Sequence, residues 1–163
     1  MDGKLRNMTS IYLYDENDRF LLLYRIGSRV VKKGYVGTAG GHFEKDELND
    51  SKACVLRELE EETNLTIEDI DDLKLRYVTL RYKNSEIRQN YYFFAKLKNN
   101  KIRIESNEGD LKWFSKDEIS NLEMPHTAKF VIEHYIKEGQ KNDKLYGGIA
   151  IKDGVEFIEL KEF

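Results

Sequence analysis

The chain has 163 residues and a formal net charge of −3, and 40% of its residues are hydrophobic. This length is enough for a globular unit with a real apolar core, and we expect a single domain over residues 1–163. The nearly balanced charge argues against nonspecific binding of DNA or RNA, and no apolar run reaches membrane-spanning length, so neither nucleic acid nor a membrane is an expected partner.

The first expected elements are two strands. Residues 8–14 (Met-Thr-Ser-Ile-Tyr-Leu-Tyr) and 19–25 (Arg-Phe-Leu-Leu-Leu-Tyr-Arg) are rich in strand formers, and the acidic segment 15–18 between them reads as a turn. The apolar run of the second strand is almost continuous, which predicts a central strand buried on both faces.

A basic segment follows the second strand and contains four cations: Arg25, Arg29, Lys32 and Lys33. They are either ordinary surface charge or contacts for a phosphate at the mouth of a site. Arg25, at the end of a strand, is the candidate substrate-binding residue.

Segment 40–65 combines paired glycines, a short polar loop and an expected helix. Asp50 or Ser51 can cap the start of this helix, because a short side-chain oxygen accepts a first-turn amide. Asn64 stands where helices often end in the left-handed conformation, which Asn tolerates. Cys54 is the only cysteine; we expect a packed thiol, no internal disulfide and a reducing cytoplasm.

Glu58, Glu61 and Glu62 lie three and four residues apart, so they share one face of the helix. Arg57 can pair with Glu61, but one guanidinium does not offset the whole cluster. Mg²⁺ prefers oxygen ligands and is held by a few carboxylates together with substrate phosphates. An acidic run of this kind usually marks a solvated helix face, but the glycines, histidine and further acids just before it favour a metal platform.

Gly41, Glu47 and residues 57–65 resemble the Nudix box, Gly-x5-Glu-x7-Arg-Glu-U-x-Glu-Glu-x-Gly-U, in which U is a bulky aliphatic residue. Nine residues instead of seven separate Glu47 from Arg57, and Asn64 replaces the last glycine. The resemblance implies an α/β Nudix fold, with a mixed β-sheet sandwiched between helices. It also implies hydrolysis of a diphosphate bond linked to a nucleoside or another group.

The same resemblance implies roles for individual residues. The principal metal ligands would be Glu61, Glu62 and the backbone carbonyl of Gly40. Glu58 would be a further ligand or the base that deprotonates water, and the choice of base differs among members of the family. Arg57 would orient the acids by ion pairing, and Glu47 would support it from the loop. The implied cofactor is Mg²⁺, with Mn²⁺ as a substitute.

An antiparallel pair of strands is expected at residues 73–82 and 89–97, across a turn at 83–86. The second strand carries four aromatic residues in a row at 91–94. Most of these rings should belong to the core, and one facing a cleft could stack on a base.

An acidic loop at residues 107–110 runs into a short aromatic strand. In Nudix enzymes a loop this far along the chain often supplies another acid. Glu108 is therefore a candidate metal ligand and Asp110 the second choice, with a solvated turn as the alternative.

The remaining residues predict two helices and a hairpin without a proposed part in the chemistry. Residues 115–118 resemble a capping box that starts a short helix, 127–137 read as an amphipathic helix, and 145–160 read as a hairpin. His126 and His134 are expected to be packing or surface residues.

The leading interpretation is a Mg²⁺-dependent pyrophosphohydrolase that converts a nucleoside triphosphate, such as 8-oxo-dGTP, to the monophosphate and pyrophosphate, similar to bacterial MutT-type members. Within the enzymes, the alternatives are ADP-ribose, a nucleotide sugar, a dinucleoside polyphosphate or capped RNA. A protein of another class, a nucleotide sensor, would bind a nucleotide without cleaving it. The sequence argues against a sensor, because all the acids expected of an enzyme are present. A small nucleotide is the expected partner, and the aromatic strands could also form a homodimer face.

Overall fold

The computed structural model describes residues 2–25, 34–100 and 102–163, so the expected cations Arg29, Lys32 and Lys33 lie outside the described residues. The strands are β1 Leu5–Tyr14, β2 Phe20–Arg25, β3 Tyr35–Val36, β4 Ala39–His42, β5 Ile70–Lys83, β6 Glu86–Leu97, β7 Gly109–Phe114, β8 Tyr146–Ile151 and β9 Gly154–Glu159. The helices are α1 Ser51–Thr63, α2 Lys116–Ile119 and α3 His126–Lys137, with short 3-10 turns at Lys45–Glu47, Ile67–Asp69 and Gly139–Lys141.

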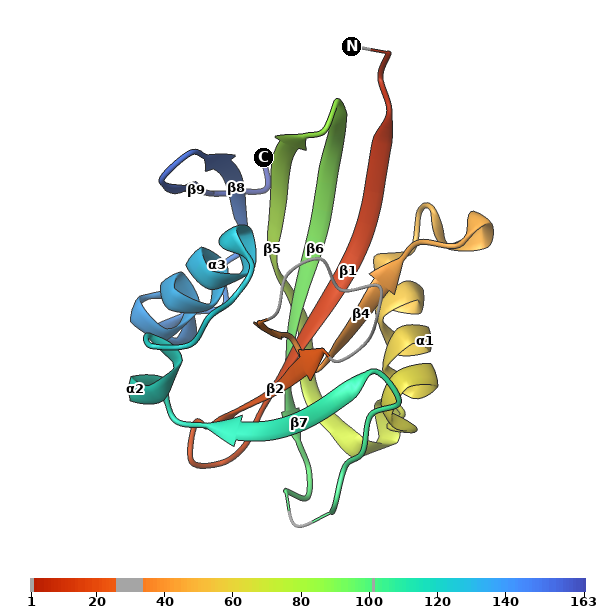
Figure 1. Cartoon of the computed structure of the whole chain (residues 1–163), viewed down its shortest axis with the longest axis vertical. Helices are drawn as coiled ribbons and strands as arrows, with labels where there is room; N and C mark the ends of the chain where they lie inside the picture. Colours follow the sequence, from red (N-terminus) through yellow and green to blue (C-terminus); the bar gives the residue numbers. More distant parts are fainter. Residues whose placement is uncertain (1, 26–33, 101) are drawn as a thin grey trace.

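The strands form one sheet in the order β3-β2-β1-β6-β5-β8-β9, with β4 attached to β1 and β7 to β2 (Figure 1). The sheet is mixed, because β1 is parallel to β6 and β5 is parallel to β8, while the remaining pairs are antiparallel. The pairing of β1 with β6 joins segments about eighty residues apart, Leu5 to Ile87 and Tyr14 to Lys96. This pairing places β1, from the start of the chain, next to β6 in the middle of the sheet.

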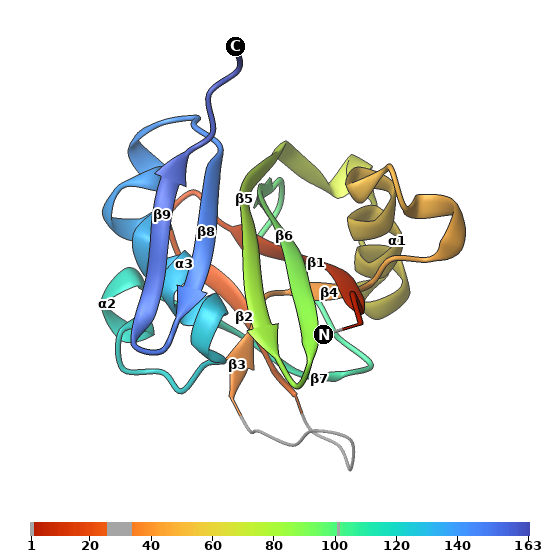
Figure 2. The same ribbon diagram turned by 90° about the horizontal axis from the view of Figure 1, so that it is seen from above.

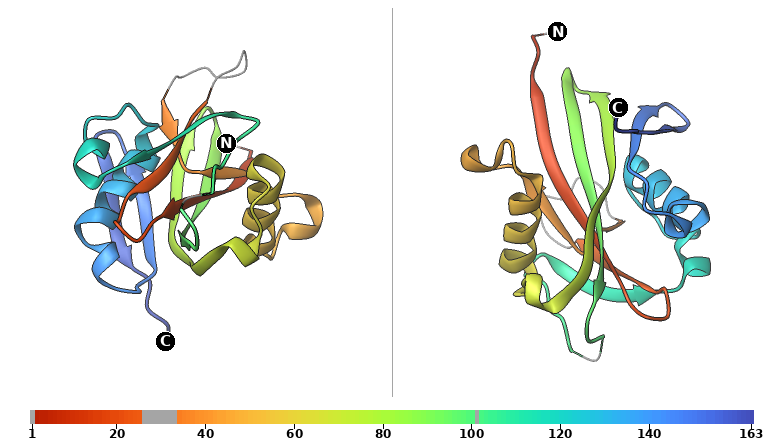
Figure 3. Two further views of the ribbon diagram at one scale, coloured as in Figure 1. Left: turned by 90° about the horizontal axis from the view of Figure 1, so that it is seen from below. Right: turned by 180° about the vertical axis from the view of Figure 1, so that it is seen from behind.

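Helices cover opposite faces of this sheet (Figure 2). Helix α1 lies against β4 and β1, whereas α3 lies against β5 and β9. The views from below and from behind show the same sandwich (Figure 3). The predicted α/β architecture, a mixed sheet between helices, is therefore confirmed.

Two apolar clusters fill the layers on either side of the sheet. Ile11 and Leu13 of β1 belong to the cluster beneath α1, and Tyr12 between them belongs to the cluster beneath α3. This alternation follows from the pleat, which points successive side chains to opposite faces. Among the described residues, none of the helices is long and apolar enough to cross a membrane.

The predicted elements are confirmed, with longer strands than the sequence indicated. The first strand of the antiparallel pair was expected at residues 73–82, but β5 begins at Ile70, because this side chain is only 4% exposed and enters the core. The hairpin between β5 and β6 turns at Asn84 and Ser85, which both have positive φ (52° and 60°). Such a two-residue turn matches the twist of the flanking strands, so it extends the pairing to Lys83 and Glu86.

The caps of α1 are also confirmed. The Asp50 carboxylate accepts a hydrogen bond from the amide of Ala53 at 3.0 Å, and Asn64 ends the helix in the left-handed region with φ of 62°. The capping box expected at Ser115 is wrong, because Ser115 precedes α2 without a side-chain hydrogen bond to the helix. His134 packs as predicted, with Nδ1 at 2.7 Å from the Tyr77 hydroxyl.

Candidate active site

A pocket of about 830 Å³ opens between α1, the β1–β4 pair and the start of α3. Its walls bring together most of the residues that the sequence singled out: Gly40, Glu58, Glu61, Glu62, Arg57, Arg25 and Glu108. Residues from four separate stretches of the chain thus meet in one place. This convergence supports a single site, while the role of each residue stays a prediction.

Paired glycines let β4 approach both β1 and α1. In β4, Gly40 lies opposite Ser10 and Gly41 opposite Thr9. A Cβ on Gly40 would collide with the Thr9 backbone carbonyl, and a Cβ on Gly41 would occupy the place of the Glu58 carboxylate. Glycine is therefore needed at both positions for different reasons, the first for sheet pairing and the second for the position of an acid.

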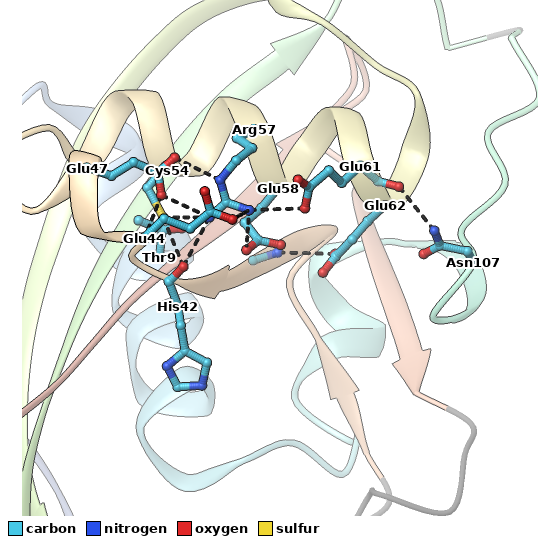
Figure 4. A network of polar contacts seen from close by, with 11 residues as sticks. Thr9, His42, Glu44, Glu47, Cys54, Arg57, Glu58, Glu61, Glu62 and Asn107 are labelled. Carbon is cyan, nitrogen blue, oxygen red and sulfur yellow. Dashed lines mark hydrogen bonds and ion pairs between the residues drawn. The ribbon is translucent and has the colours of Figure 1, made fainter.

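Arg57 lies at the centre of a network of acids (Figure 4). Its Nε and Nη2 donate to the two carboxylate oxygens of Glu47 at 2.8 and 2.9 Å. Its Nη1 donates to Glu58 at 2.9 Å and to Glu61 at 3.0 Å. One guanidinium is thus shared among several carboxylates, which is the orienting geometry expected of it.

Glu47 supports Arg57 from the loop and does not line the pocket. It is only 6% exposed, and the Arg57 guanidinium lowers the pKa of its carboxyl to about 2. The amide of Glu44 donates to the same carboxylate at 2.9 Å, through the 3-10 turn at Lys45–Glu47. The two additional residues of the motif are therefore accommodated between Glu47 and α1 without loss of the ion pair.

Glu62 is held differently from the acids bound to Arg57. The Gly40 amide donates to Glu62 at 3.3 Å. Burial raises the pKa of Glu62 to about 7, and the charges of Glu58 and Glu108 add to this effect while the Gly40 bond and Arg25 oppose it. Near neutral pH this carboxyl therefore carries a proton part of the time, because burial outweighs the Gly40 bond and the charge of Arg25.

Glu108 reaches the pocket because the residue before it is fastened to the end of α1. The backbone amide of Asn107 donates to the Glu62 carbonyl at 3.3 Å, and its side-chain amide donates to the Glu61 carbonyl at 3.1 Å (Figure 4). Both carbonyls belong to the last turn of the helix, where no intrahelical donor is available. Asp110, the second choice, lies in β7 and lines a different pocket.

Two buried donors in the pocket have no hydrogen-bond partner among the described residues: Arg25 Nε and the Tyr12 hydroxyl. An unpaired buried polar group costs about 1–3 kcal/mol. Polar atoms of a ligand would remove this cost. The position of Arg25 thus supports its predicted contact with substrate, whereas Tyr12 was read only as part of a strand.

Other polar residues of the pocket were missed by the sequence analysis. Arg6 and Ser10 point to the same face of β1 as Tyr12, and Asn90 lies on β6 beside them. The available signal was the alternation of Arg6, Ser10 and Tyr12 on one face of β1, interrupted only by Met8. None of the aromatic residues 91–94 lines this pocket; Phe43 does, and its ring contacts Tyr91 at 5.3 Å between centroids.

The described residues do not form a complete cage for a metal. No group of three or more His, Cys, Asp or Glu side chains within residues 2–25, 34–100 and 102–163 converges on one point. Glu58 and Glu61 instead turn to Arg57. The donors nevertheless fit a hard cation, because Mg²⁺ is usually held by one or two carboxylates plus substrate phosphates, and Glu62 makes no ion pair with a residue that the structure describes.

The profile described as NUDIX domain matches residues 4–135. Because this match spans most of the 163 residues, the chain belongs to the NUDIX domain family. Its members hydrolyse diphosphate bonds, and this chain is accordingly a pyrophosphohydrolase.

Solved structures with low sequence identity share the fold. The Mutator MutT protein from Bacillus halodurans is 22% identical with a TM-score of 0.61, and the match covers 94% of this chain and 97% of that chain. An Ap4A hydrolase from C. elegans is 20% identical with a TM-score of 0.58, covering 69% and 82%. A bifunctional NMN adenylyltransferase/ADP ribose pyrophosphatase from Francisella tularensis, complexed with AMP and a Mn ion, is 22% identical with a TM-score of 0.63, covering 83% and 42%. A search of curated proteins finds no match to the sequence.

Proposed function

We propose that this enzyme is a Mg²⁺-dependent hydrolase of a nucleoside diphosphate-linked substrate, and that a nucleoside triphosphate such as 8-oxo-dGTP is cleaved to the monophosphate and pyrophosphate. The observation that carries the proposal is an excess of acid on one pocket wall. Glu58 and Glu61 share one guanidinium, and burial raises the pKa of Glu62 to about 7. A divalent cation would relieve this excess, and a phosphate chain would complete its coordination.

In this proposal Glu61, Glu62 and the Gly40 carbonyl hold Mg²⁺, with Glu108 available from the opposite loop. When bound, Mg²⁺ neutralises phosphate oxygens and lowers the pKa of a coordinated water. Mn²⁺ could substitute, since it too accepts oxygen ligands.

Glu58 is the proposed general base or a further ligand. Arg57 holds Glu58 and Glu61 in place and is itself held by Glu47, so its charge is fixed relative to the acids. Arg25 lines the same pocket with an unpaired Nε, which suits contact with a phosphate oxygen. A pocket pre-arranged in this way would stabilise charge that develops on the phosphates during hydrolysis.

The choice among substrates is the finer part of the proposal. A nucleoside triphosphate is proposed because the sequence resembles MutT-type members. Structural coverage does not choose between substrates, since a MutT protein aligns over 97% and a C. elegans Ap4A hydrolase over 96% of their own lengths. Other similar structures are named for Ap4A and ADP ribose, so these compounds are the competing substrates. A nucleotide sensor is disfavoured, because the pocket keeps the acids that hydrolysis needs.

The test is a panel of nucleotides incubated with the enzyme, with Mg²⁺ and with EDTA, and with products separated by anion-exchange chromatography. The panel contains the common nucleoside triphosphates, 8-oxo-dGTP, ADP-ribose, a nucleotide sugar, Ap4A and a capped RNA. We expect Mg²⁺-dependent release of pyrophosphate and monophosphate, fastest with a triphosphate. Cleavage of ADP-ribose or Ap4A alone would reassign the substrate, and binding without any cleavage would establish the sensor.

Two broader expectations accompany the function. Cys54 is a buried free thiol, which suits the reducing cytoplasm that we propose as the location. The homodimer expected from the aromatic strands stays a prediction.

A further inference from the structure

A second pocket, of about 140 Å³, lies beside the candidate active site and shares Met8, Asn90 and Ala128 with it. The other lining residues come from β5, β6 and the start of α3: Thr79, Arg81, Arg88, Tyr92, Pro125 and Thr127. We call this space the arginine pocket. None of its residues outside the shared three has a part in the proposed hydrolysis.

Positive charge is concentrated around the arginine pocket. Arg81 of β5 and Arg88 of β6 are directly opposite each other in the strand register, an arrangement that is destabilising for like charges. Glu86 compensates only part of this charge, since it pairs with Arg88 at 3.1 Å and also with Arg6 at 3.4 Å. Arg81 makes no ion pair with any residue that the structure describes.

The first turn of α3 adds donors to the same pocket. Pro125 precedes the helix and provides no side-chain cap. The N-terminus of a helix carries a partial positive charge and exposed amides, which favour an anion. Thr127 in this turn is 8% exposed, and its hydroxyl is buried without a hydrogen-bond partner in the described part of the chain.

The two arginines, the first turn of α3 and the Thr127 hydroxyl would all be satisfied by one bound anion. We propose that the arginine pocket binds a second phosphate group of the substrate, at the end remote from the diphosphate that is cleaved. The inference rests on the proposed function for the orientation of the substrate, and it extends the substrate class to nucleotides that carry a further phosphate, such as one on the 3′ oxygen of the ribose.

The distance between the two sites fits one nucleotide. Gly40 pairs with Ser10, and Arg88 pairs with Arg6 on the far side of the same strand, β1. Two strand spacings of about 4.8 Å and four residues of about 3.3 Å separate their Cα atoms by roughly 16 Å. Arg88 lines the arginine pocket, so this pocket lies within the reach of one extended nucleotide from Gly40.

Binding is the direct test, because it needs neither metal nor turnover. Isothermal titration in EDTA compares guanosine 3′,5′-bisphosphate with guanosine 5′-monophosphate, and the matching adenosine pair, on the wild-type enzyme and on Arg81→Gln. We expect the bisphosphate to bind at least tenfold more tightly to the wild type, and this preference to fall to threefold or less in Arg81→Gln. The matched control is Arg103→Gln, since Arg103 is 89% exposed and belongs to neither pocket, and it should keep the full preference.

Equal binding of the two nucleotides, or a preference that survives in Arg81→Gln, would overturn the inference. Inorganic phosphate serves as a third ligand. If phosphate raises the melting temperature of the wild type and not of Arg81→Gln while the two nucleotides bind alike, the pocket holds free phosphate and the assignment to substrate is wrong. Failure of the proposed function is distinguishable, because it would appear as absent hydrolysis of every triphosphate, including guanosine 3′-phosphate 5′-triphosphate, with the binding preference intact.

Discussion

Two arginines in this enzyme hold buried carboxylates, and their surroundings differ in the balance of charge. In the turn after β1, Arg19 binds Asp15 through Nη2 at 2.7 Å and Nε at 2.8 Å, and backbone amides complete the coordination of the acid. Asp15 is 1% exposed, and the pair has one positive and one negative charge. Burial would raise the pKa of Asp15, but the hydrogen bonds from Arg19 outweigh it and lower the pKa.

Arg57 also uses Nε and Nη2, but it binds both carboxylate oxygens of Glu47 where Arg19 binds one oxygen of Asp15. Its Nη1 binds Glu58 and Glu61 in addition. Its acids therefore outnumber it, and two of them line an open pocket. A balanced pair closes a turn and has no charge left for a ligand, whereas the unbalanced cluster retains negative charge that a cation can use. The comparison separates a structural ion pair from a site by charge count and access to the pocket.

Glu58→Gln is the substitution with the largest expected effect on turnover. Removal of the proposed base should lower kcat by about 10²–10⁴-fold, the range typical of a lost general base. The melting temperature should stay within a few degrees of the wild type. The matched control is Glu60→Gln, an exposed position on the same helix that does not line the pocket, and it should keep wild-type turnover in a Mg²⁺-dependent pyrophosphate-release assay.

Arg57→Gln should cost about 3 kcal/mol of unfolding free energy, because it leaves Glu47 buried without a counter-charge. It should also lower turnover, since Glu58 and Glu61 lose their shared donor. Arg19→Gln should cost about 1 kcal/mol, since backbone amides still bind Asp15, and should not change turnover. Chemical denaturation and steady-state kinetics of both variants give the comparison, and equal losses of activity would refute it.

The stability contributed by Glu47 should depend on pH. Its folded-state pKa of about 2 lies below the ordinary value, so its contribution is complete above the ordinary carboxyl pKa and is lost as pH falls toward 2. Glu47→Gln should therefore destabilise the enzyme by about 2 kcal/mol at pH 7 and by nearly nothing at pH 2. Urea denaturation across this range measures the difference, and a difference independent of pH would contradict the assigned ion pair.

Gly41→Ala should give the smallest effect, a loss of about tenfold in kcat/KM, or about 1.4 kcal/mol. The added Cβ meets the carboxylate of Glu58, the end of a flexible side chain that can move away, so stability should change little. Gly40→Ala provides the contrast, because its Cβ meets the Thr9 backbone and should destabilise the fold. If Gly41→Ala kept full activity, the observed position of Glu58 would be irrelevant to catalysis.

Local sequence signals were sufficient for much of this site. The spacing of Glu58, Glu61 and Glu62 depends only on helical geometry, and the caps at Asp50 and Asn64 depend on single side chains. Such features can be read from one sequence because the interacting residues are close along the chain. The contact of Glu108 with the pocket came from the family resemblance, and Asn107, which fastens that loop to α1, carried no recognisable signal.

The pocket residues on β1 and β6 could not be predicted from local sequence patterns. Ser10 and Asn90 face the same space because β1 pairs in parallel with β6, a contact across eighty residues that no local pattern specifies. The opposition of Arg81 and Arg88 is local by contrast, because it follows from the two-residue turn at Asn84 and Ser85, which the sequence analysis placed only within residues 83–86. The capping box at Ser115 shows the converse, a local pattern whose hydrogen bond does not form.

The most direct test of the central claim is the Mg²⁺ dependence of pyrophosphate release by Glu61→Gln compared with the wild type. If the acids on this face of α1 hold the cation, the variant should require a much higher Mg²⁺ concentration or lose turnover altogether, while remaining folded by circular dichroism. Superimposable Mg²⁺ curves for the two proteins would contradict the account and remove the acidic face from the chemistry.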